Sequence, residues 1–112
     1  MENDSFKILF GNCRIEYDIN KEMKNISKHR YSLESAVFHF EKLILPVPSE
    51  GFLTYELTRK GQETRHKHIS KDDEGNITVI ITTMRDNNVI RIISYRRANK
   101  NEISLYNYYI KN

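Results

Sequence analysis

The chain has 112 residues, of which 38% are hydrophobic and 29% are charged, and its formal net charge is +3. This length suits one domain, and the composition is too apolar for a disordered chain. A single cysteine, Cys13, excludes an intramolecular disulfide and a zinc site built from cysteines. Because neither a signal-peptide pattern nor a membrane-spanning apolar run is present, we expect one cytoplasmic domain over residues 1–112.

The N-terminal part predicts two short strands and a helix. Apolar residues at 6–10 and the alternation at 13–17 are typical of strands. Asp18 is a suitable N-cap for a helix from Ile19 to about Lys28. We expect Met23 and Ile26 on the buried face of that helix.

A second helix is predicted after Ser32, which is its N-cap. Its apolar residues recur with helical spacing and should form part of the core: Leu33, Ala36, Val37 and Phe40. Residues 43–45 precede two prolines, which favours a short edge segment because proline cannot donate to a sheet ladder.

The second half of the chain predicts a sheet and a last helix. Residues 52–58 fit a strand or a loop, whereas 64–70 fit a polar strand followed by a turn at 72–76. Residues 77–84 and 89–97 predict an antiparallel hairpin around a tight turn at 86–88. Asn99 and Glu102 indicate a capped helix from 99 to about 110, with Leu105 and Tyr109 on one face. The order predicts an α+β domain with helices packed on an antiparallel sheet.

Basic residues gather in two segments of this second half. Residues 59–71 and 85–100 each hold five lysines and arginines against one acid. Paired in a sheet, the two segments would form the basic patch expected of an RNA or DNA binder. By strand alternation Arg91, Tyr95 and Arg97 should share one face and Arg96 the other. The alternative is a basic strand whose arginines are solvated or paired with acids.

A series of motifs extends over roughly residues 15–107. In chain order they are Tyr17-Asp18, Lys21, Asn25 and Lys28-His29, then Ser32-Leu33-Glu34-Ser35-Ala36 with Phe40, then Glu63-Thr64-Arg65 and Ile69-Ser70, then Arg91 to Ala98 with Glu102 and Tyr106. In these motifs the chain resembles the BrnT toxins of bacterial type II toxin–antitoxin pairs. It departs from them at Arg30 and Ser70, where the family usually has glycine, at Ser35, usually glutamate, and at Tyr95, usually alanine. Residues 1–12 extend beyond the usual start.

The resemblance implies a RelE-like fold, with two N-terminal helices and one C-terminal helix on the sheet. It implies a metal-independent endoribonuclease that needs no cofactor and arrests translation. It also implies a BrnA-like antitoxin with a ribbon-helix-helix domain, a heterotetramer built on an antitoxin dimer, and operator DNA contacted only through that antitoxin.

Metal-free RNA cleavage proceeds by attack of the 2′-OH on the neighbouring phosphate, which needs cations on the phosphate and proton-transfer groups. We therefore predict Arg65, Arg91, Arg96 and His29 as catalytic residues, although Arg91 could instead lie outside the groove. The predicted substrate-binding residues are Lys28, Lys67, Arg97 and Tyr106, and no metal site is predicted.

Other interpretations stay open. His29 could simply cap a helix C-terminus, where positive charge is favoured. His66 and His68 fit either two metal ligands or, more plainly, a solvated polar strand. Glu63 and Glu102 could pair structurally with Arg65 and Arg97. The whole protein could be a catalytically degenerate module that only binds antitoxin or nucleic acid, or a toxin that acts through the ribosome.

Overall fold

The computed structural model describes residues 14–44, 51–57, 63–85 and 88–110. The predicted strand at 6–10 and most of the predicted turn at 86–88 lie outside these residues. The elements in chain order are β1 (Arg14–Tyr17), α2 (Ile19–His29), α3 (Leu33–Ile44), β2 (Phe52–Leu57), β3 (Arg65–Lys71), β4 (Ile77–Arg85), β5 (Val89–Arg97) and α4 (Lys100–Tyr109). None of the described helices has the length and apolar character needed to cross a membrane.

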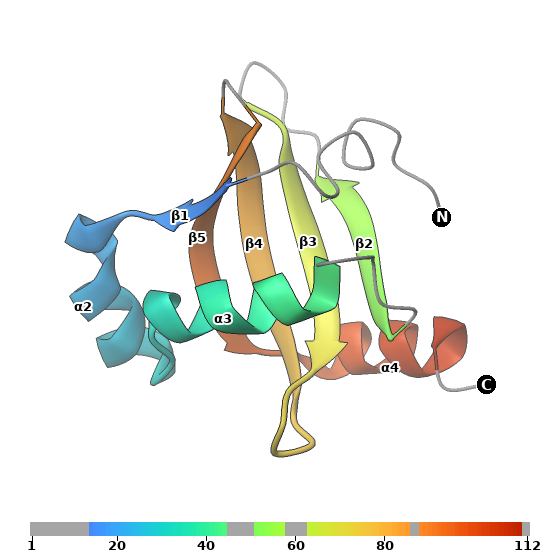
Figure 1. The fold of residues 1–112 in the computed structure, drawn as a ribbon. Coiled ribbons are helices and arrows are strands. Elements are labelled where there is room, and N and C mark those ends of the chain that lie inside the picture. Colours follow the sequence, from blue (N-terminus) through green and yellow to red (C-terminus); the bar gives the residue numbers. More distant parts are fainter. Residues whose placement is uncertain (1–13, 45–50, 58–62, 86–87, 111–112) are drawn as a thin grey trace.

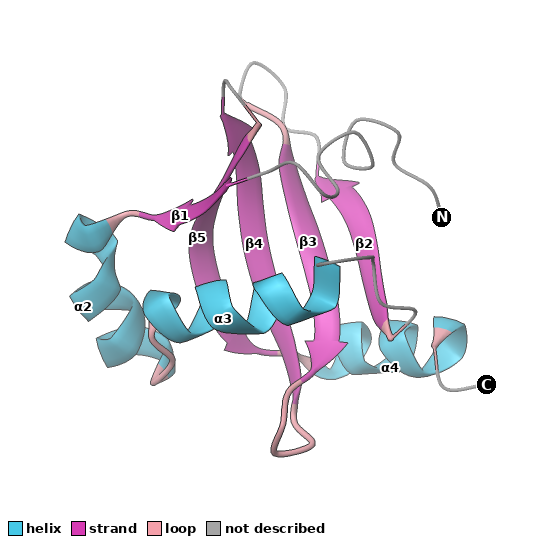
Figure 2. Cartoon of the chain, in the orientation of Figure 1, coloured by secondary structure: helices cyan, strands magenta, loops and turns pink. Residues whose placement is uncertain are grey.

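The described strands form one sheet in the order β1-β5-β4-β3-β2 (Figure 1). Strands β2 to β5 form an antiparallel meander, which confirms the predicted hairpin and makes residues 52–57 a strand. Strand β1 pairs in parallel with β5. Helix α3 crosses one face of the sheet, and α4 lies behind the opposite face, near β2 and β3 (Figure 2). This arrangement confirms the predicted α+β class.

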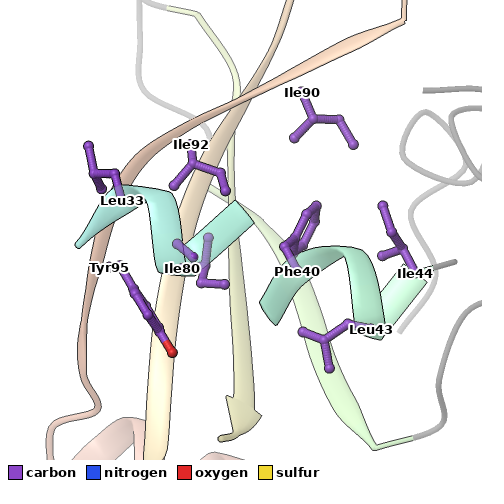
Figure 3. Packing of buried hydrophobic residues seen from close by; sticks show 9 residues of the cluster. Leu33, Phe40, Leu43, Ile44, Ile80, Ile90, Ile92 and Tyr95 are labelled. Carbon is purple, nitrogen blue, oxygen red and sulfur yellow. The ribbon is translucent and has the colours of Figure 1, made fainter. Parts of the chain in front are cut away.

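The larger part of the core lies between α3 and the sheet (Figure 3). The predicted helical stripe is confirmed, since Leu33, Ala36 and Phe40 are fully buried against Ile80, Ile90 and Ile92 of β4 and β5. Leu43 and Ile44 belong to α3, so the edge segment predicted at 43–45 is wrong where it is described. They continue the spacing of the stripe, and their burial favours another helical turn before the prolines.

A smaller cluster fills the opposite face, where α4 packs on the sheet through Tyr106 against Leu53, Ile69 and Val79. The capping arrangement of α4 is confirmed: Asn99 accepts from the Glu102 N–H at 2.9 Å, and Glu102 accepts from the Asn99 N–H at 2.8 Å. The buried side of α4 is formed by Glu102 and Tyr106, whereas Tyr109 is exposed. Leu105 also packs against this cluster, so of the two residues predicted to share a face only Leu105 contributes to the packing.

A β-bulge in β5 changes which side chains share a face. Ile81 pairs with Ser94 and Thr82 with Ile92, so Ile93 has no partner in the register. As a result Ile92 and Tyr95 both enter the core under α3, although strict alternation would separate them. The prediction that Arg91 shares a face with Tyr95 is wrong, because the extra residue moves Arg91 and Arg96 to the same side of the sheet.

Helix α2 packs with its polar side inward. Asn25 is buried, and its side-chain amide donates to the carbonyls of Tyr31 at 2.7 Å and Tyr95 at 2.9 Å. Its oxygen accepts from the Tyr95 N–H at 3.3 Å, so this one amide pairs with β5 as a further strand would. Met23 and Ile26, predicted to be buried, are exposed. The inward side of α2 is therefore set by the hydrogen bonds of Asn25 and not by the apolar residues of the helix.

Candidate functional site

A pocket of about 580 Å³ lies where the end of α2, the end of β5 and the turn after β3 meet. It is lined by Lys28, His29, Arg30, Tyr31, Asp72, Glu74, Asn76, Arg96 and Arg97. Four of the predicted site residues, Lys28, His29, Arg96 and Arg97, thus come together from segments far apart in the sequence. The walls carry both signs of charge, with the cations on α2 and β5 and the carboxylates on the turn.

The end of α2 is fixed by its C-cap. Arg30 has a φ of 63°, in the left-handed region, and its N–H donates to the Ile26 carbonyl at 2.7 Å. This conformation explains why a glycine suits the position, and it makes Arg30 a strained departure from the family pattern. Together with Asn25 on Tyr95, the cap holds Lys28 and His29 beside the end of β5.

The side chains that line the pocket differ in their hydrogen-bond partners, exposure and protonation. Arg97 donates to Asn76 at 3.0 Å and to the Tyr31 hydroxyl at 3.4 Å, and its side chain is otherwise exposed. The pKa of His29 is lowered by partial burial and then by the neighbouring charges of Lys28 and Arg96. A histidine with a lowered pKa is neutral at pH 7 and can accept a proton. His29 does lie in the last turn of α2, but a neutral ring lacks the positive charge on which the helix-capping interpretation depends.

Arg96 is held by a buried carboxylate. Glu102, only 4% exposed, accepts from both terminal nitrogens of Arg96 at 2.7 and 2.8 Å and from Lys67 at 2.6 Å. Burial raises the pKa of Glu102, but the bonds from Arg96, Lys67 and the Asn99 N–H outweigh it and bring that pKa to about 2. The predicted pairing of Glu102 with Arg97 is wrong, because the bulge turns Arg96 toward α4 instead.

Two of the predicted catalytic residues lie elsewhere on the sheet. Arg65 and Arg91 both pair in register with Thr83, on the face that Arg96 also shares. At a strand's rise, Arg91 is roughly 16 Å along β5 from Arg96. Arg91 donates to Glu16 at 2.9 Å, whereas the Nε of Arg65 is buried without a hydrogen-bond partner.

Of the predicted substrate-binding residues, Lys67 is bound to Glu102 and lies over the Tyr55 ring at 5.6 Å, and Tyr106 is buried with its hydroxyl donating to the Gly51 carbonyl at 3.3 Å. This placement does not favour stacking of Tyr106 on a base. Glu63 pairs with Arg85 at 3.6 Å and not with Arg65, so that predicted pairing is also wrong.

The histidines of β3 are fully buried and not solvated, which corrects the expectation for this strand. His68 bonds to the hydroxyls of Thr54 and Thr82, each at 2.8 Å, and burial lowers its pKa well below the ordinary value. His39 of α3 bonds in the same way to Ser70 at 2.8 Å. Over the described ranges, no three side chains of the metal-binding types gather in one place.

Sequence reasoning missed the residues that position the site. Asn25 belongs to the family pattern, but a polar residue in an amphipathic helix ordinarily indicates a solvated face. Tyr31 and Asn76, which hold Arg97, belong to loops and carried no signal. The roles of Tyr95 and Ser70, two departures from the family pattern, became visible only through packing: Tyr95 lies 4.8 Å from the Tyr31 ring, and Ser70 binds His39.

Comparison with known proteins agrees with the resemblance. Residues 17–102 match the family model of the ribonuclease toxin BrnT of type II toxin–antitoxin systems. The crystal structure of the Brucella abortus ribonuclease toxin BrnT is similar in fold, with a TM-score of 0.55 and 20% identity, over 79% of this chain and 99% of that one. No curated protein matches this chain. Because the family model covers most of its length, the chain belongs to the BrnT family of ribonuclease toxins.

Proposed function

We propose that this chain is an active endoribonuclease that cleaves RNA, without a metal, in the pocket between α2 and β5. The observation that carries the proposal is the meeting of Lys28, His29, Arg96 and Arg97 in one pocket. Lys28 from the helix end and Arg96 and Arg97 from the strand end supply positive charge on both sides of a phosphate. A neutral histidine among them supplies the group that the reaction needs for proton transfer.

In this proposal His29 accepts the proton of the 2′-OH as its oxygen bonds to phosphorus. The bond from phosphorus to the 5′ oxygen breaks, which leaves a 2′,3′-cyclic phosphate and a 5′-hydroxyl that takes its proton from water. Lys28 and Arg97, which are exposed, bind the oxygens of the scissile phosphate and stabilise the charge that grows on them during attack. Arg96 has both terminal nitrogens on Glu102, so it acts as a fixed positive charge at the wall of the pocket. The charges of Lys28 and Arg96 also keep His29 neutral.

Arg65 and Arg91 are too far along the sheet to hold the same phosphate, so we assign them to neighbouring phosphates of the substrate. In this proposal Lys67 and Tyr106 have structural roles: Lys67 binds Glu102, and Tyr106 packs in the smaller core cluster.

A type II toxin works with a cognate antitoxin. We propose, from the family alone, that this partner is a BrnA-like ribbon-helix-helix protein, that the complex is a heterotetramer built on an antitoxin dimer, and that only the antitoxin contacts operator DNA. Mass measurement of the purified complex tests this stoichiometry.

The test of cleavage uses purified protein and an end-labelled RNA, with EDTA present and ribosomes absent. We expect products that end in a 2′,3′-cyclic phosphate, and a loss of at least a hundredfold in rate for His29→Ala, because a positioned general base contributes about that much or more. Lys28→Ala should also slow cleavage. Its matched control is Lys24→Ala, which removes another exposed lysine of α2 that lies outside the pocket and should leave the rate unchanged.

The other outcomes are distinct. A folded protein that cuts no RNA but arrests growth would point to ribosome dependence. One that neither cuts nor arrests would favour the degenerate binding module. Cleavage that survives His29→Ala undiminished would remove His29 from the mechanism while leaving the enzyme.

A further inference from the structure

A second pocket, of about 300 Å³, adjoins the one between α2 and β5 and lies between α3 and the turn after β3. One side of α3 faces it, because the lining residues of that helix recur with helical spacing: Ser35, Phe38, His39 and Lys42. The first and second pockets share Tyr31, Asp72 and Glu74 in their linings. A nucleotide whose phosphate lies in the first pocket can therefore place its base in the second.

The apolar part of the second pocket is aromatic. Phe38 is 62% exposed, and the rings of Tyr31 and Tyr95 lie 4.8 Å apart. The His39 ring lies within 19° of parallel to that of Tyr95, and its bond to Ser70 holds it there. Tyr95 and Ser70 both depart from the usual family pattern, so this lining differs from the usual one. Unstacked bases of single-stranded RNA stack on aromatic rings of this kind.

The charge of the second pocket is opposite to that of the first. Three carboxylates line it, those of Asp72, Asp73 and Glu74. The lysine in its lining, Lys42, is bound to Asp73 at 2.9 Å. Burial lowers the pKa of His39 despite the nearby carboxylates, so its ring is neutral at pH 7. The second pocket therefore repels a phosphate and favours an uncharged base that offers hydrogen-bond donors.

Of the three carboxylates, that of Glu74 is best suited to a base. Asp72 accepts from the N–H groups of Glu74 and Asn76, both at 2.9 Å, and Asp73 holds Lys42. Glu74 is exposed and lines both pockets. Guanine presents two adjacent donors, its N1–H and its 2-amino group, which the two oxygens of one carboxylate accept together. Adenine and cytosine each present an amino group beside a ring acceptor that a carboxylate repels, and uracil presents a single N–H between two carbonyls.

We propose that the second pocket binds a guanine base next to the scissile phosphate, stacked on Phe38 and hydrogen-bonded to Glu74, and so sets the sequence preference of cleavage. This inference rests on the function proposed above for the cut, whereas recognition of the base rests on the second pocket alone. Cuts should therefore fall beside guanosines in single-stranded RNA, where the base is free to leave its stack.

The first test compares cleavage of uridine oligomers that contain one guanosine, inosine, adenosine or cytidine. We expect cuts beside guanosine, roughly tenfold faster than beside inosine, which lacks the 2-amino group and offers one donor instead of two. Phe38→Ala should slow the cut beside guanosine by roughly tenfold, the effect of losing a stacking ring. Glu74→Gln should bring the guanosine and inosine rates together.

The matched controls are Tyr109→Ala and Glu41→Gln, which remove an exposed ring of α4 and an exposed carboxylate of α3 outside both pockets. Both should keep the wild-type preference. Because Phe38 and Glu74 are exposed, their variants should melt at the wild-type temperature. Cleavage that is indifferent to the base, or centred on a base other than guanine, would overturn the proposal.

The second test measures binding without cleavage. Oligomers of 2′-deoxynucleotides have no 2′-OH to attack, so their affinity reports recognition alone. A deoxythymidine oligomer with one deoxyguanosine should bind roughly tenfold more tightly than the same oligomer with deoxyinosine, and Glu74→Gln should remove the difference. Equal affinity for the two, or no binding of either, would contradict the guanine site. Selective binding by a wild type that cuts no RNA would remove the nuclease and keep the guanine site, so the two proposals fail separately.

Discussion

Replacing Glu102 with glutamine should destabilise the protein by about 3 kcal/mol at pH 7. Glutamine keeps the shape and the capping bond to Asn99 but removes the charge that Arg96 and Lys67 share. Lowering a pKa from 4.5 to about 2 corresponds to about 3 kcal/mol in favour of the ionised form in the folded state. Breaking a buried pair costs about 3–5 kcal/mol, and the lower end applies because both cations still reach water.

The assay is urea unfolding of wild type and Glu102→Gln between pH 7 and pH 2. A carboxylate whose pKa is lowered by folding stabilises the protein fully above pH 4.5, and this contribution disappears as the pH falls toward 2. The wild type should therefore lose its advantage over the variant in that interval. Glu41→Gln, on the exposed side of α3, is the control and should change stability by less than about 0.5 kcal/mol. A Glu102→Gln variant within about 1 kcal/mol of wild type at pH 7 would refute the reasoning.

Three further predictions concern the histidines of the core and the two devices that fix α2. Burial keeps His68 neutral in the folded protein, whereas in the unfolded chain it becomes protonated below pH 6.5, so the free energy of unfolding should decrease as the pH drops below 6.5. His68→Gln should reduce the slope of melting temperature against pH, and an equal slope in the variant would contradict this. Arg30→Gly should be more stable than Arg30→Ala by about 1 kcal/mol in urea unfolding, because only glycine adopts a φ of 63° without strain; equal stability would show that the cap is relaxed in solution. Asn25→Ala should lower the free energy of unfolding by about 2–4 kcal/mol, because it leaves the N–H and carbonyl of Tyr95 unpaired. Hydrogen exchange of the Tyr95 amide should accelerate, and protection as strong as in wild type would show that another group pairs the Tyr95 backbone.

The fold was largely predictable because its strongest signals are local. The β-branched runs at 77–84 and 89–97 and the capped helix after Asn99 need only short-range chemistry, and the apolar stripe of α3 follows from helical spacing. Which side chains of β5 share a face was not predictable, because the β-bulge at Ile93 depends on how that part of the strand packs in the folded sheet. The burial of α2 was misjudged for a related reason: its polar side satisfies backbone groups of β5 that no local pattern reveals.

The candidate site was predictable as a set of residue types but not as a geometry. Lys28, His29, Arg96 and Arg97 meet in the pocket, whereas Arg65 and Arg91 lie higher on the sheet. Charge clustering along a chain cannot tell a cation that faces a substrate from one held by a buried acid. Arg96 and Lys67 are held by Glu102, a residue of α4, and this contact forms only because α4 packs back onto the sheet.

The place of β1 and α2 beside β5 has a consequence for synthesis of the chain. Strands β2 to β5 pair with strands that are next to them in sequence, whereas β1 and α2 contact β5, which is much later in the chain. The contacts of Glu16 with Arg91 and of Asn25 with Tyr95 each span 70 residues or more. Such contacts close late in folding, because the entropy of a long loop must be overcome first. On the ribosome, α2 and α3 emerge well before the strand that completes the pocket. A growing or truncated chain that lacks β5 therefore holds Lys28 and His29 without Arg96 and Arg97, so the residues of the pocket come together only after β5 has been made.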